Sequence, residues 1–377
     1  MARNAKHFDL AVVGAGICGL AHALAAARRG KRVVVLDRDA QANGASIRNF
    51  GFVTVTGQQA GEHWSRAMRS REVWAEVAAQ AGIPILQRGL LVVARRPEAR
   101  AVLEQFLSTS MGQGCGFLES QEIQVRFPGL RRGAFAGALL SPHELRVESR
   151  EAIPRLAAFL EECHGVEFLR STVVHAAMAP RVETSRGLVH ADAVVACPGD
   201  DFHALHADRI ASYRLTRCRL QMLRLEAPTV EVPRHAVMSD LGLVRYLGYA
   251  ALPAAAALRA RLADEQGEHL RRGVHLIVVR SADGSLVVGD SHDDAATPTP
   301  FGEVTVDRLI LDEYAAVFDG PPPAIREHWT GTYATSADRL VVVDEPSPAT
   351  RVVLVTSGTG ASISFALAED VIGGLFD

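Results

Sequence analysis

A glycine-rich turn between an apolar strand and an Ala/Leu-rich helix constrains this chain more than any other feature. The strand covers Leu10–Val13, and the pattern Gly14-x-Gly16-x-x-Gly19 follows at once. In such a turn Gly14 permits the tight bend, Gly16 lets a pyrophosphate approach the backbone, and Gly19 allows close packing of helix on strand. The helix N-terminus presents free N–H groups and a positive dipole end to the phosphates. The stretch therefore predicts a dinucleotide-binding unit.

The residues after this helix support the same interpretation. The helix ends near Gly30, a second strand covers Arg32–Leu36, and an acid, Asp37, follows. Asp37 lies 18 residues after Gly19, where its carboxylate can accept hydrogen bonds from an adenosine ribose. Its charge repels a 2′-phosphate, which disfavours NADP. A lone G-x-G-x-x-G also occurs in ordinary glycine-rich turns, but here strand, turn, helix, strand and acid follow in the required order.

Length and composition exclude several classes of protein. The 377 residues suit two intertwined domains, and the net charge of −3 with scattered Lys and Arg argues against a nucleic-acid partner. No apolar run approaches the ~18 residues of a membrane span, and the residues before the first strand do not resemble a signal peptide. The five cysteines and 14 histidines show no metal-ligand spacing. We therefore expect a cytoplasmic protein with reduced thiols and no metal.

Two later segments also end strands in small residues. Near the C-terminus a strand over Arg351–Val355 meets the glycine-rich segment Thr356–Ser362, and a helix over Ile363–Ile372 follows. This junction again directs N–H groups and a helix dipole toward an electron-rich group. Further upstream, a turn at Ala191-Asp192 precedes a buried strand that ends at Pro198-Gly199. That end is either a second cofactor contact or an ordinary turn, and the pattern does not decide between them.

The middle of the chain has a different pattern. Between about 205 and 334, short alternating stretches such as Arg217–Leu225, Val244–Tyr249 and Val274–Arg280 predict an antiparallel sheet. Before it, amphipathic helices are predicted at Glu62–Ala81 and Val147–Cys163.

Taken together, these segments resemble the FAD-dependent amine oxidoreductases, the family that includes D-amino acid oxidase, glycine oxidase and monomeric sarcosine oxidase. The resemblance covers the whole chain. Besides the first fingerprint it rests on four stretches: Gly44–Gly51, Ala196–Gly199, Trp329–Asp338 and Ser357–Ser362.

The resemblance implies an α/β fold, in which a Rossmann-type FAD-binding domain is joined to a discontinuous, mainly antiparallel β-sheet substrate domain. The FAD-binding domain is expected to combine residues 1–75, 146–205 and 335–377. The substrate domain is expected to combine residues 76–145 and 206–334.

The resemblance also assigns the FAD contacts by position. The first glycines hold the pyrophosphate and Asp37 the ribose, while the segment at Val174 touches adenine. Residues 44–49 run beside the flavin, and the C-terminal glycine-rich segment lies at its N1–C2=O edge, where a helix N-terminus stabilises charge on the reduced ring. The predicted FAD-binding residues are Gly14, Gly16, Gly19, Asp37, Arg38, Ala45, Ser46, Val174, Gly199, Gly358, Thr359, Gly360, Ala361 and Ser362.

Four positions depart from the pattern of these relatives. Tyr333 stands where glycine oxidase has the Arg that holds the substrate carboxylate, and Ser362 replaces a Lys of the sarcosine oxidase pattern. Gly331 stands where that pattern has its flavin-bonding Cys, so FAD is expected to bind non-covalently. An apolar residue near Val287 replaces the Lys that activates oxygen, which leaves the electron acceptor, oxygen or another compound, open.

A narrower resemblance points to a substrate. Gly44–Phe52, Gly284–His292 and Trp329–Tyr333 resemble flavoenzymes associated with bacterial phosphonate breakdown, which act on aminoethylphosphonates, particularly N-methylated ones. Hydride would pass from the α-carbon of a neutral amine to flavin N5, and the iminium product would hydrolyse to an aldehyde and an amine. Positioning supplies much of such catalysis, and no side chain stands out as a general base.

Five side chains are candidates for contact with this small-molecule amine: Arg48, Asn49, Tyr246, His292 and Tyr333. Each also has an ordinary structural interpretation, as a surface loop residue, a core aromatic residue or a histidine at a strand end. The sequence is also compatible with other functions, namely a glycine, sarcosine or D-amino acid oxidase, a glycerol-3-phosphate-like dehydrogenase, and a non-catalytic or RNA-modification module. The oligomeric state is open.

Overall fold

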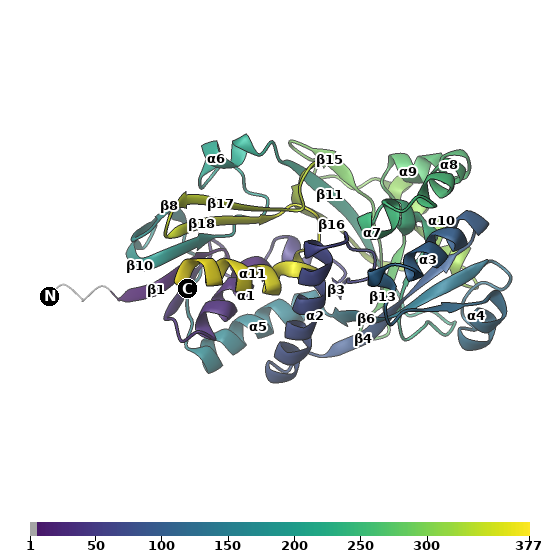
Figure 1. Cartoon of the computed structure of the whole chain (residues 1–377), viewed down its shortest axis with the longest axis horizontal. Helices are drawn as coiled ribbons and strands as arrows, with labels where there is room; N and C mark the ends of the chain where they lie inside the picture. The colour runs from purple at the N-terminus through teal and green to yellow at the C-terminus, as the bar shows by residue number, and fades with distance from the viewer. Residues whose placement is uncertain (1–5) are drawn as a thin grey trace.

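The chain forms two β-sheets over residues 6–377, the part that this computed structural model describes (Figure 1). The first sheet has eight strands, and its main path runs β17-β18-β10-β1-β2-β7. β1 (His7–Val13) lies inside this sheet and pairs in parallel with β10 (Gly187–Ala196) and β2 (Val33–Leu36). The other strands of the sheet are β7 (Glu167–Leu169), β8 (Val174–Met178), β9 (Arg181–Thr184), β17 (Val341–Ser347) and β18 (Thr350–Val355).

Helices cover the first sheet because its central strands are apolar on both faces. Every residue of β2 is buried, and parallel strands of this kind need a covering layer on each side. α11 (Gly360–Phe376) packs against both α1 (Ile17–Ala27) and α2 (Glu62–Gln80). Within this layer the rings of Trp74 and Phe365 meet edge to face with 5.1 Å between their centroids. The start and the end of the chain therefore share one hydrophobic core.

The second sheet is mainly antiparallel. Its longest pairing joins β11 (Thr216–Leu225) to β16 (Ile325–Thr335), and its main path runs β15-β11-β14-β13-β12-β4-β6-β3. The one exception in direction among the strands described is the parallel pair β12–β4. The other strands of this sheet are β3 (Phe52–Val53), β4 (Ile85–Ala94), β5 (Gly116–Leu118), β6 (Gly137–Val147), β12 (Ala236–Met238), β13 (Ile277–Arg280), β14 (Leu286–Gly289) and β15 (Asp293–Ala295).

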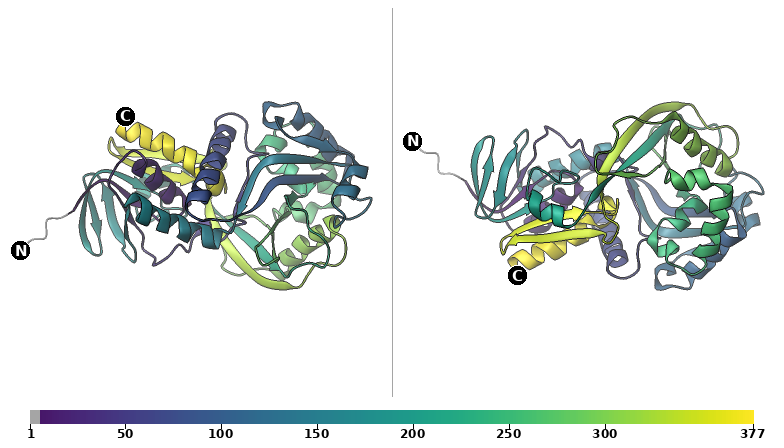
Figure 2. Two further views of the ribbon diagram at one scale, coloured as in Figure 1. Left: turned by 90° about the horizontal axis from the view of Figure 1, so that it is seen from below. Right: turned by 90° about the horizontal axis from the view of Figure 1, so that it is seen from above.

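The two sheets occupy opposite halves of the molecule. Figure 2 shows the purple N-terminal and yellow C-terminal elements together in one half, with the second sheet and the green helices in the other. No helix within residues 6–377 combines the length and the apolar character needed to cross a membrane. The remaining helices are α3 (Pro97–Leu107), α4 (Ser120–Arg126), α5 (Ser149–His164), α6 (Ala207–Ser212), α7 (Leu247–Ala250), α8 (Ala255–Glu265), α9 (Gly267–Arg271) and α10 (Val304–Val317), with 3-10 turns at Ala45–Ile47, Ser110–Gly112 and Asp240–Val244.

This architecture confirms the predicted α/β fold with a Rossmann-type unit and a mainly antiparallel second sheet. The domain boundaries stay a prediction. One strand crosses the expected division, because β3 lies within residues 1–75 but pairs with β6 of the second sheet.

Two sequence-based assignments are wrong. The predicted turn at Ala191-Asp192 does not exist, because β10 continues through it and its pairing with β1 runs on from His190 to Ala193. The predicted strand Val244–Tyr249 is instead the end of a 3-10 turn followed by α7. The turn is fixed by Asp240, which is buried and accepts hydrogen bonds from Arg96 at 2.9 and 3.0 Å. A tertiary ion pair thus overrides the local alternation of apolar and polar residues.

Candidate active site

A cavity of about 480 Å³ runs from the first glycine-rich turn to the second sheet, a volume typical of small-molecule and cofactor sites. It lies at the carboxyl ends of the parallel strands, where ligands of open α/β sheets bind. The cavity is lined by all fourteen residues predicted to contact FAD and by all five predicted to contact substrate. The structure thus brings the sequence-based candidates together, while the role of each residue stays a prediction.

The first glycine-rich turn is shaped as a cradle that side chains would fill. Gly14 has φ +106°, and a Cβ there would lie 2.6 Å from the carbonyl oxygen of Cys197. A Cβ on Gly16 would lie 2.9 Å from Ser46 Oγ, and one on Gly19 would overlap the carbonyl oxygen of Gly14. Backbone atoms exclude a side chain at Gly14 and Gly19, and at Gly16 a Cβ would displace Ser46 Oγ, which accepts a hydrogen bond from Ile17 N–H. The turn leaves backbone and the start of α1 facing the cavity, the arrangement that binds a pyrophosphate.

Asp37 closes this turn from the end of β2. Its Oδ2 accepts a hydrogen bond from the Ala15 N–H at 2.6 Å, and its Oδ1 accepts one from Asp39 N–H at 2.8 Å. Because each carboxylate oxygen has a further lone pair, Asp37 can still accept hydrogen bonds from a ribose. Next to it, Arg38 forms an ion pair of 2.9 Å with Asp201 across the rim of the cavity.

The C-terminal junction faces the cavity from the same edge of the first sheet, because β18 runs parallel to β10 and β10 to β1. Gly358 has φ +69°, and a Cβ there would lie 2.9 Å from the Tyr333 ring. Ser362 is buried, and its Oγ accepts a hydrogen bond of 2.9 Å from Thr54 N–H. Ser362 thereby ties the start of α11 to the segment after β3, which is a different task from that of the Lys at this position in the sarcosine oxidase pattern.

A polar cluster of Arg245, His275, Asp290 and His292 lies where the cavity meets the second sheet. Asp290 Oδ1 lies 3.2 Å from His275 Nδ1 and 3.7 Å from His292 Nδ1. The shorter contact is poorly aligned, so Asp290 Oδ1 and both nitrogens of His275 have no hydrogen-bond partner among the described residues. Buried polar groups without partners are costly. This cluster is therefore suited to receive polar groups of a ligand.

Burial and one cation set the charges of this cluster. Burial raises the pKa of Asp290 to about 7, and the Arg245 guanidinium works in the opposite direction. Burial and the same guanidinium lower the pKa of both His275 and His292, so both rings are neutral near pH 7. Arg245 itself is exposed to the cavity and forms no ion pair within residues 6–377. The cluster therefore offers one free cation and one carboxyl that titrates near neutral pH.

The five residues predicted to contact substrate differ in how far their polar atoms are already engaged in hydrogen bonds within the protein. The ring centroid of Tyr246 lies 5.6 Å from that of His275, and the ring centroid of His292, itself part of the cluster, lies 6.4 Å from that of Tyr333. The Arg48 guanidinium donates a hydrogen bond of 3.0 Å to Asn43 Oδ1, and the Arg48 carbonyl oxygen accepts a hydrogen bond from the Trp329 indole N–H.

Both polar atoms of the Asn49 side chain are already hydrogen-bonded to nearby backbone. Its Nδ2 donates to the Ala45 carbonyl oxygen and its Oδ1 accepts from Gly51 N–H, both at 2.7 Å. These two bonds hold the shape of the loop beside the cavity.

Sequence reasoning missed Arg245, His275 and Asp290. One signal was available, because Asp290 directly follows the apolar strand β14 and an acid at such a strand end is a site candidate. The absence of a bound metal stays a prediction. Among the described residues, however, two groups bring possible metal-ligating atoms within 4.8 Å of one another, His275–Asp290–His292 and Cys18–His22–Cys197. The Cys–His group combines a one-turn helical spacing with a residue that directly follows a distant strand, and no C-x-x-C pattern reveals this.

Comparisons with known proteins agree with this architecture. A curated relative, monomeric sarcosine oxidase of Bacillus sp. (strain B-0618), is 26% identical over 201 residues, 51% of this chain and 51% of that protein. The chain thus matches about half the length of this relative.

Several solved structures share the fold. Glycine oxidase from Geobacillus kaustophilus has a TM-score of 0.76 at 18% identity and covers 98% of this chain and 94% of its own. L-proline dehydrogenase from P. horikoshii has a TM-score of 0.78 at 17% sequence identity, and the match covers 99% of this chain and 94% of that enzyme. L-alpha-glycerophosphate oxidase from Mycoplasma pneumoniae, solved with FAD bound, has a TM-score of 0.74 at 16% sequence identity, and the match covers 98% of this chain and 95% of that enzyme.

The family itself is identified by a match over nearly the whole chain. Residues 9–372 match the model of the family described as FAD dependent oxidoreductase (DAO). The glycine cradle, the acid after β2 and the second junction at α11 are the features that such a cofactor needs. The protein therefore belongs to the FAD-dependent oxidoreductase family.

Proposed function

We propose that the protein oxidises the C–N bond of a small anionic amine, an aminophosphonate with or without an N-methyl group. The observation that carries this proposal is the cavity, which joins the glycine cradle to the polar cluster. One end fits the dinucleotide, and the other offers a free cation, Arg245, beside a buried acid, Asp290. The similarity to monomeric sarcosine oxidase supports amine chemistry.

The cofactor end of the cavity is formed by residues from both ends of the chain. Gly14, Gly16 and Asp37 would hold the pyrophosphate and ribose, and Gly358–Ser362 would lie at the flavin. When bound, FAD supplies a two-electron acceptor for the hydride of the substrate. We propose non-covalent binding, because Gly331, which stands at the flavin-bonding Cys position, packs against the Arg48 backbone.

The residues at the substrate end would bind the anionic group of the substrate and accept a proton from its amine. Arg245, with Arg48 further along the cavity wall, would hold the anionic group. A tetrahedral phosphonate suits such dispersed donors because its oxygens point in different directions, whereas a planar carboxylate suits one bidentate Arg. Asp290, with its pKa raised to about 7, would accept the proton of the substrate ammonium. The amine then becomes neutral, as hydride loss from its α-carbon requires.

Anaerobic bleaching of the flavin tests the substrate class. Small aminophosphonates should reduce the flavin faster than glycine, sarcosine or D-alanine at equal concentration. Fastest bleaching by one of these amino acids would leave amine oxidation standing and exclude the phosphonate. Fastest bleaching by glycerol 3-phosphate would replace the amine by a phosphorylated alcohol, the substrate class named for the M. pneumoniae structure.

Replacement of Arg245 should weaken substrate binding selectively. We expect Arg245→Met to raise the Kd of the anionic amine by roughly 10- to 150-fold, because charged hydrogen bonds worth about 1.5–3 kcal/mol are lost. Arg48→Met should raise it roughly tenfold. Arg308→Met, on the exposed face of α10, is the matched control. Unchanged Kd in Arg245→Met, measured by flavin difference spectra, would show that the anion binds elsewhere.

Replacement of Asp37 should weaken the binding of FAD and not that of the substrate. Asp37→Ala removes a charge-assisted acceptor for the ribose and the support of the Ala15 N–H, so we expect FAD affinity to fall by about 1.5–3 kcal/mol. Fluorescence titration of the apoprotein measures this, with the exposed Asp192→Ala as control. Acid precipitation should release yellow flavin from both variants; colour in the pellet would contradict non-covalent binding.

A further inference from the structure

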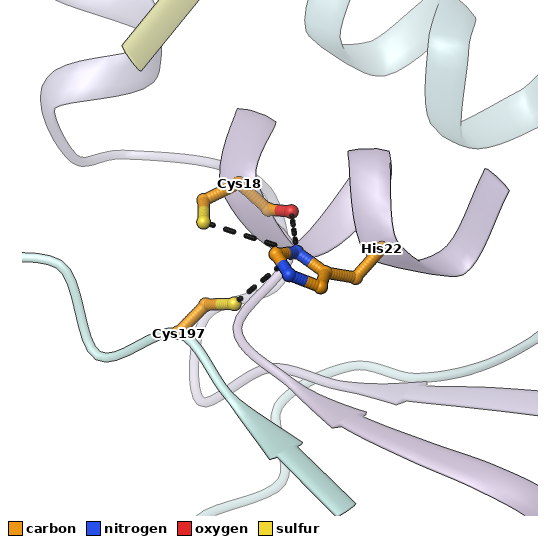
Figure 3. A group of neighbouring side chains, drawn as sticks. All are labelled: Cys18, His22 and Cys197. Carbon is orange, nitrogen blue, oxygen red and sulfur yellow. Dashed lines mark hydrogen bonds between the residues drawn. The ribbon is translucent and has the colours of Figure 1, made fainter. Parts of the chain in front are cut away.

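Two thiols and an imidazole meet beside the first glycine-rich turn (Figure 3). Cys18 is the second residue of α1, and His22 follows one turn later on the same helix. Cys197 comes directly after β10. Because β1 and β10 pair in parallel with Val13 opposite Ala196, both strands end at the same edge, and Cys197 meets the start of α1. The group is therefore fixed by the central strands of the sheet.

The spacing of these side chains approaches that of a metal site. Both sulfurs lie 3.9 Å from His22 Nδ1, and all three atoms fall within 4.8 Å of one another. With Zn–S near 2.3 Å and Zn–N near 2.0 Å, two ligands of a tetrahedral site lie about 3.5–3.8 Å apart. Small side-chain rotations would close the difference. Nδ1 now hydrogen-bonds to the Cys18 carbonyl oxygen at 2.7 Å, and an ion would take the place of that proton.

The three side chains are shielded from solvent to different degrees, with both cysteines partly buried. His22 is fully buried, and its Nε2 has no hydrogen-bond partner among the described residues. Both cysteines also line the large cavity, so an ion held here would keep access to a further ligand.

We propose that Cys18, His22 and Cys197 form a binding site for one thiophilic metal ion of the Zn²⁺ class, with a fourth coordination position open to the cavity. Two thiolates and an imidazole are the donors that such ions select over Mg²⁺ or Ca²⁺. Binding would release the thiol protons and join α1 to β10 through the ion. The site is independent of the substrate, so it stands whether or not the proposed amine oxidation is right.

Cobalt(II) is a suitable probe, because its d–d bands lie to the red of flavin absorption. We expect reduced, chelator-treated holoprotein under anaerobic conditions to bind one Co²⁺ per chain, with thiolate charge-transfer and tetrahedral d–d bands that Zn²⁺ abolishes. Cys18→Ser, Cys197→Ser and His22→Gln should each weaken binding by roughly tenfold or more. Cys163→Ser, which removes an exposed thiol of α5, should bind as the wild type does.

A second measurement needs no variant, so its result does not depend on whether the variants fold. Zinc K-edge EXAFS of the wild-type protein should report two sulfur ligands and at least one nitrogen ligand. Coordination by nitrogen and oxygen alone would place the ion at His275–Asp290–His292 and overturn the proposal. Absence of d–d bands while all five thiols remain titratable would overturn it too.

Discussion

Asp290→Asn should slow reduction of the flavin by substrate by roughly 10²- to 10⁴-fold at pH 7, the usual contribution of a positioned proton acceptor. The variant keeps the shape of the side chain and removes its ability to take the ammonium proton. Substrate affinity should change far less, because the anion is assigned to Arg245. Anaerobic stopped-flow measurement of the limiting reduction rate separates the two effects, and Asp312→Asn on the exposed side of α10 is the control.

The pH profile gives a sharper form of this result. In the wild-type protein the reduction rate should fall below pH of about 7 as the Asp290 carboxylate becomes protonated, and this limb should vanish in Asp290→Asn. A limb that persists unchanged in the variant would assign the titration to another group.

Stability provides the control for folding. Burial raises the pKa of Asp290 from 3.8 to about 7, so the folded state favours the protonated carboxyl. The stability that this preference supplies is full below pH of about 4 and is lost as pH rises through about 7. Asp290→Asn should therefore be at least as stable as the wild type at pH 8. Loss of activity together with a lower Tm at pH 8 would mean that the variant is misfolded and that Asp290 has a structural role.

Gly19→Ala should yield protein without bound FAD. The added Cβ would overlap the carbonyl oxygen of Gly14 and lie 3.2 Å from Val12 Cγ1, so α1 must move away from β1. Overpacking usually costs about 1–3 kcal/mol, and collision with backbone, which cannot rotate away, places this variant at the upper end. The shift also opens the pyrophosphate cradle, because the same turn carries Gly14 and Gly16.

Gly374→Ala is the matched control for this variant. It lies in α11, and a Cβ there meets nothing within 4 Å. Flavin content per chain and thermal unfolding should distinguish the two proteins. A yellow Gly19→Ala protein with the Tm of the wild type would show that the turn tolerates a side chain.

The cofactor half could be predicted from the sequence because its signals are local. The turn around Gly14, the acid Asp37 and the junction at Gly358 each follow a strand of one parallel sheet, and such strand ends meet at one edge. The polar cluster could not be predicted in this way. His275 meets Asp290 because β13 and β14 pair antiparallel, and the His275 N–H donates to the Asp290 carbonyl oxygen at 3.0 Å.

Arg245 was missed for a related reason. The segment that carries it alternates like a strand, yet Arg245 lies between a short helix and a 3-10 turn, and the first residue of that turn, Asp240, forms a buried ion pair with Arg96. Register and long-range ion pairs are tertiary properties, and neither leaves a periodic pattern in the local sequence.

The strand order of the first sheet has a consequence for how the protein is made. β1 lies beside β10, and β10 beside β18, so the three strands leave the ribosome at widely separated times. Until β10 emerges, one edge of β1 has no neighbour, and until α11 emerges the apolar side of α1 stays uncovered. Open strand edges and uncovered apolar surface are the features that make nascent chains aggregate. A cell that produces this enzyme must therefore shield a half-built cofactor domain through most of translation.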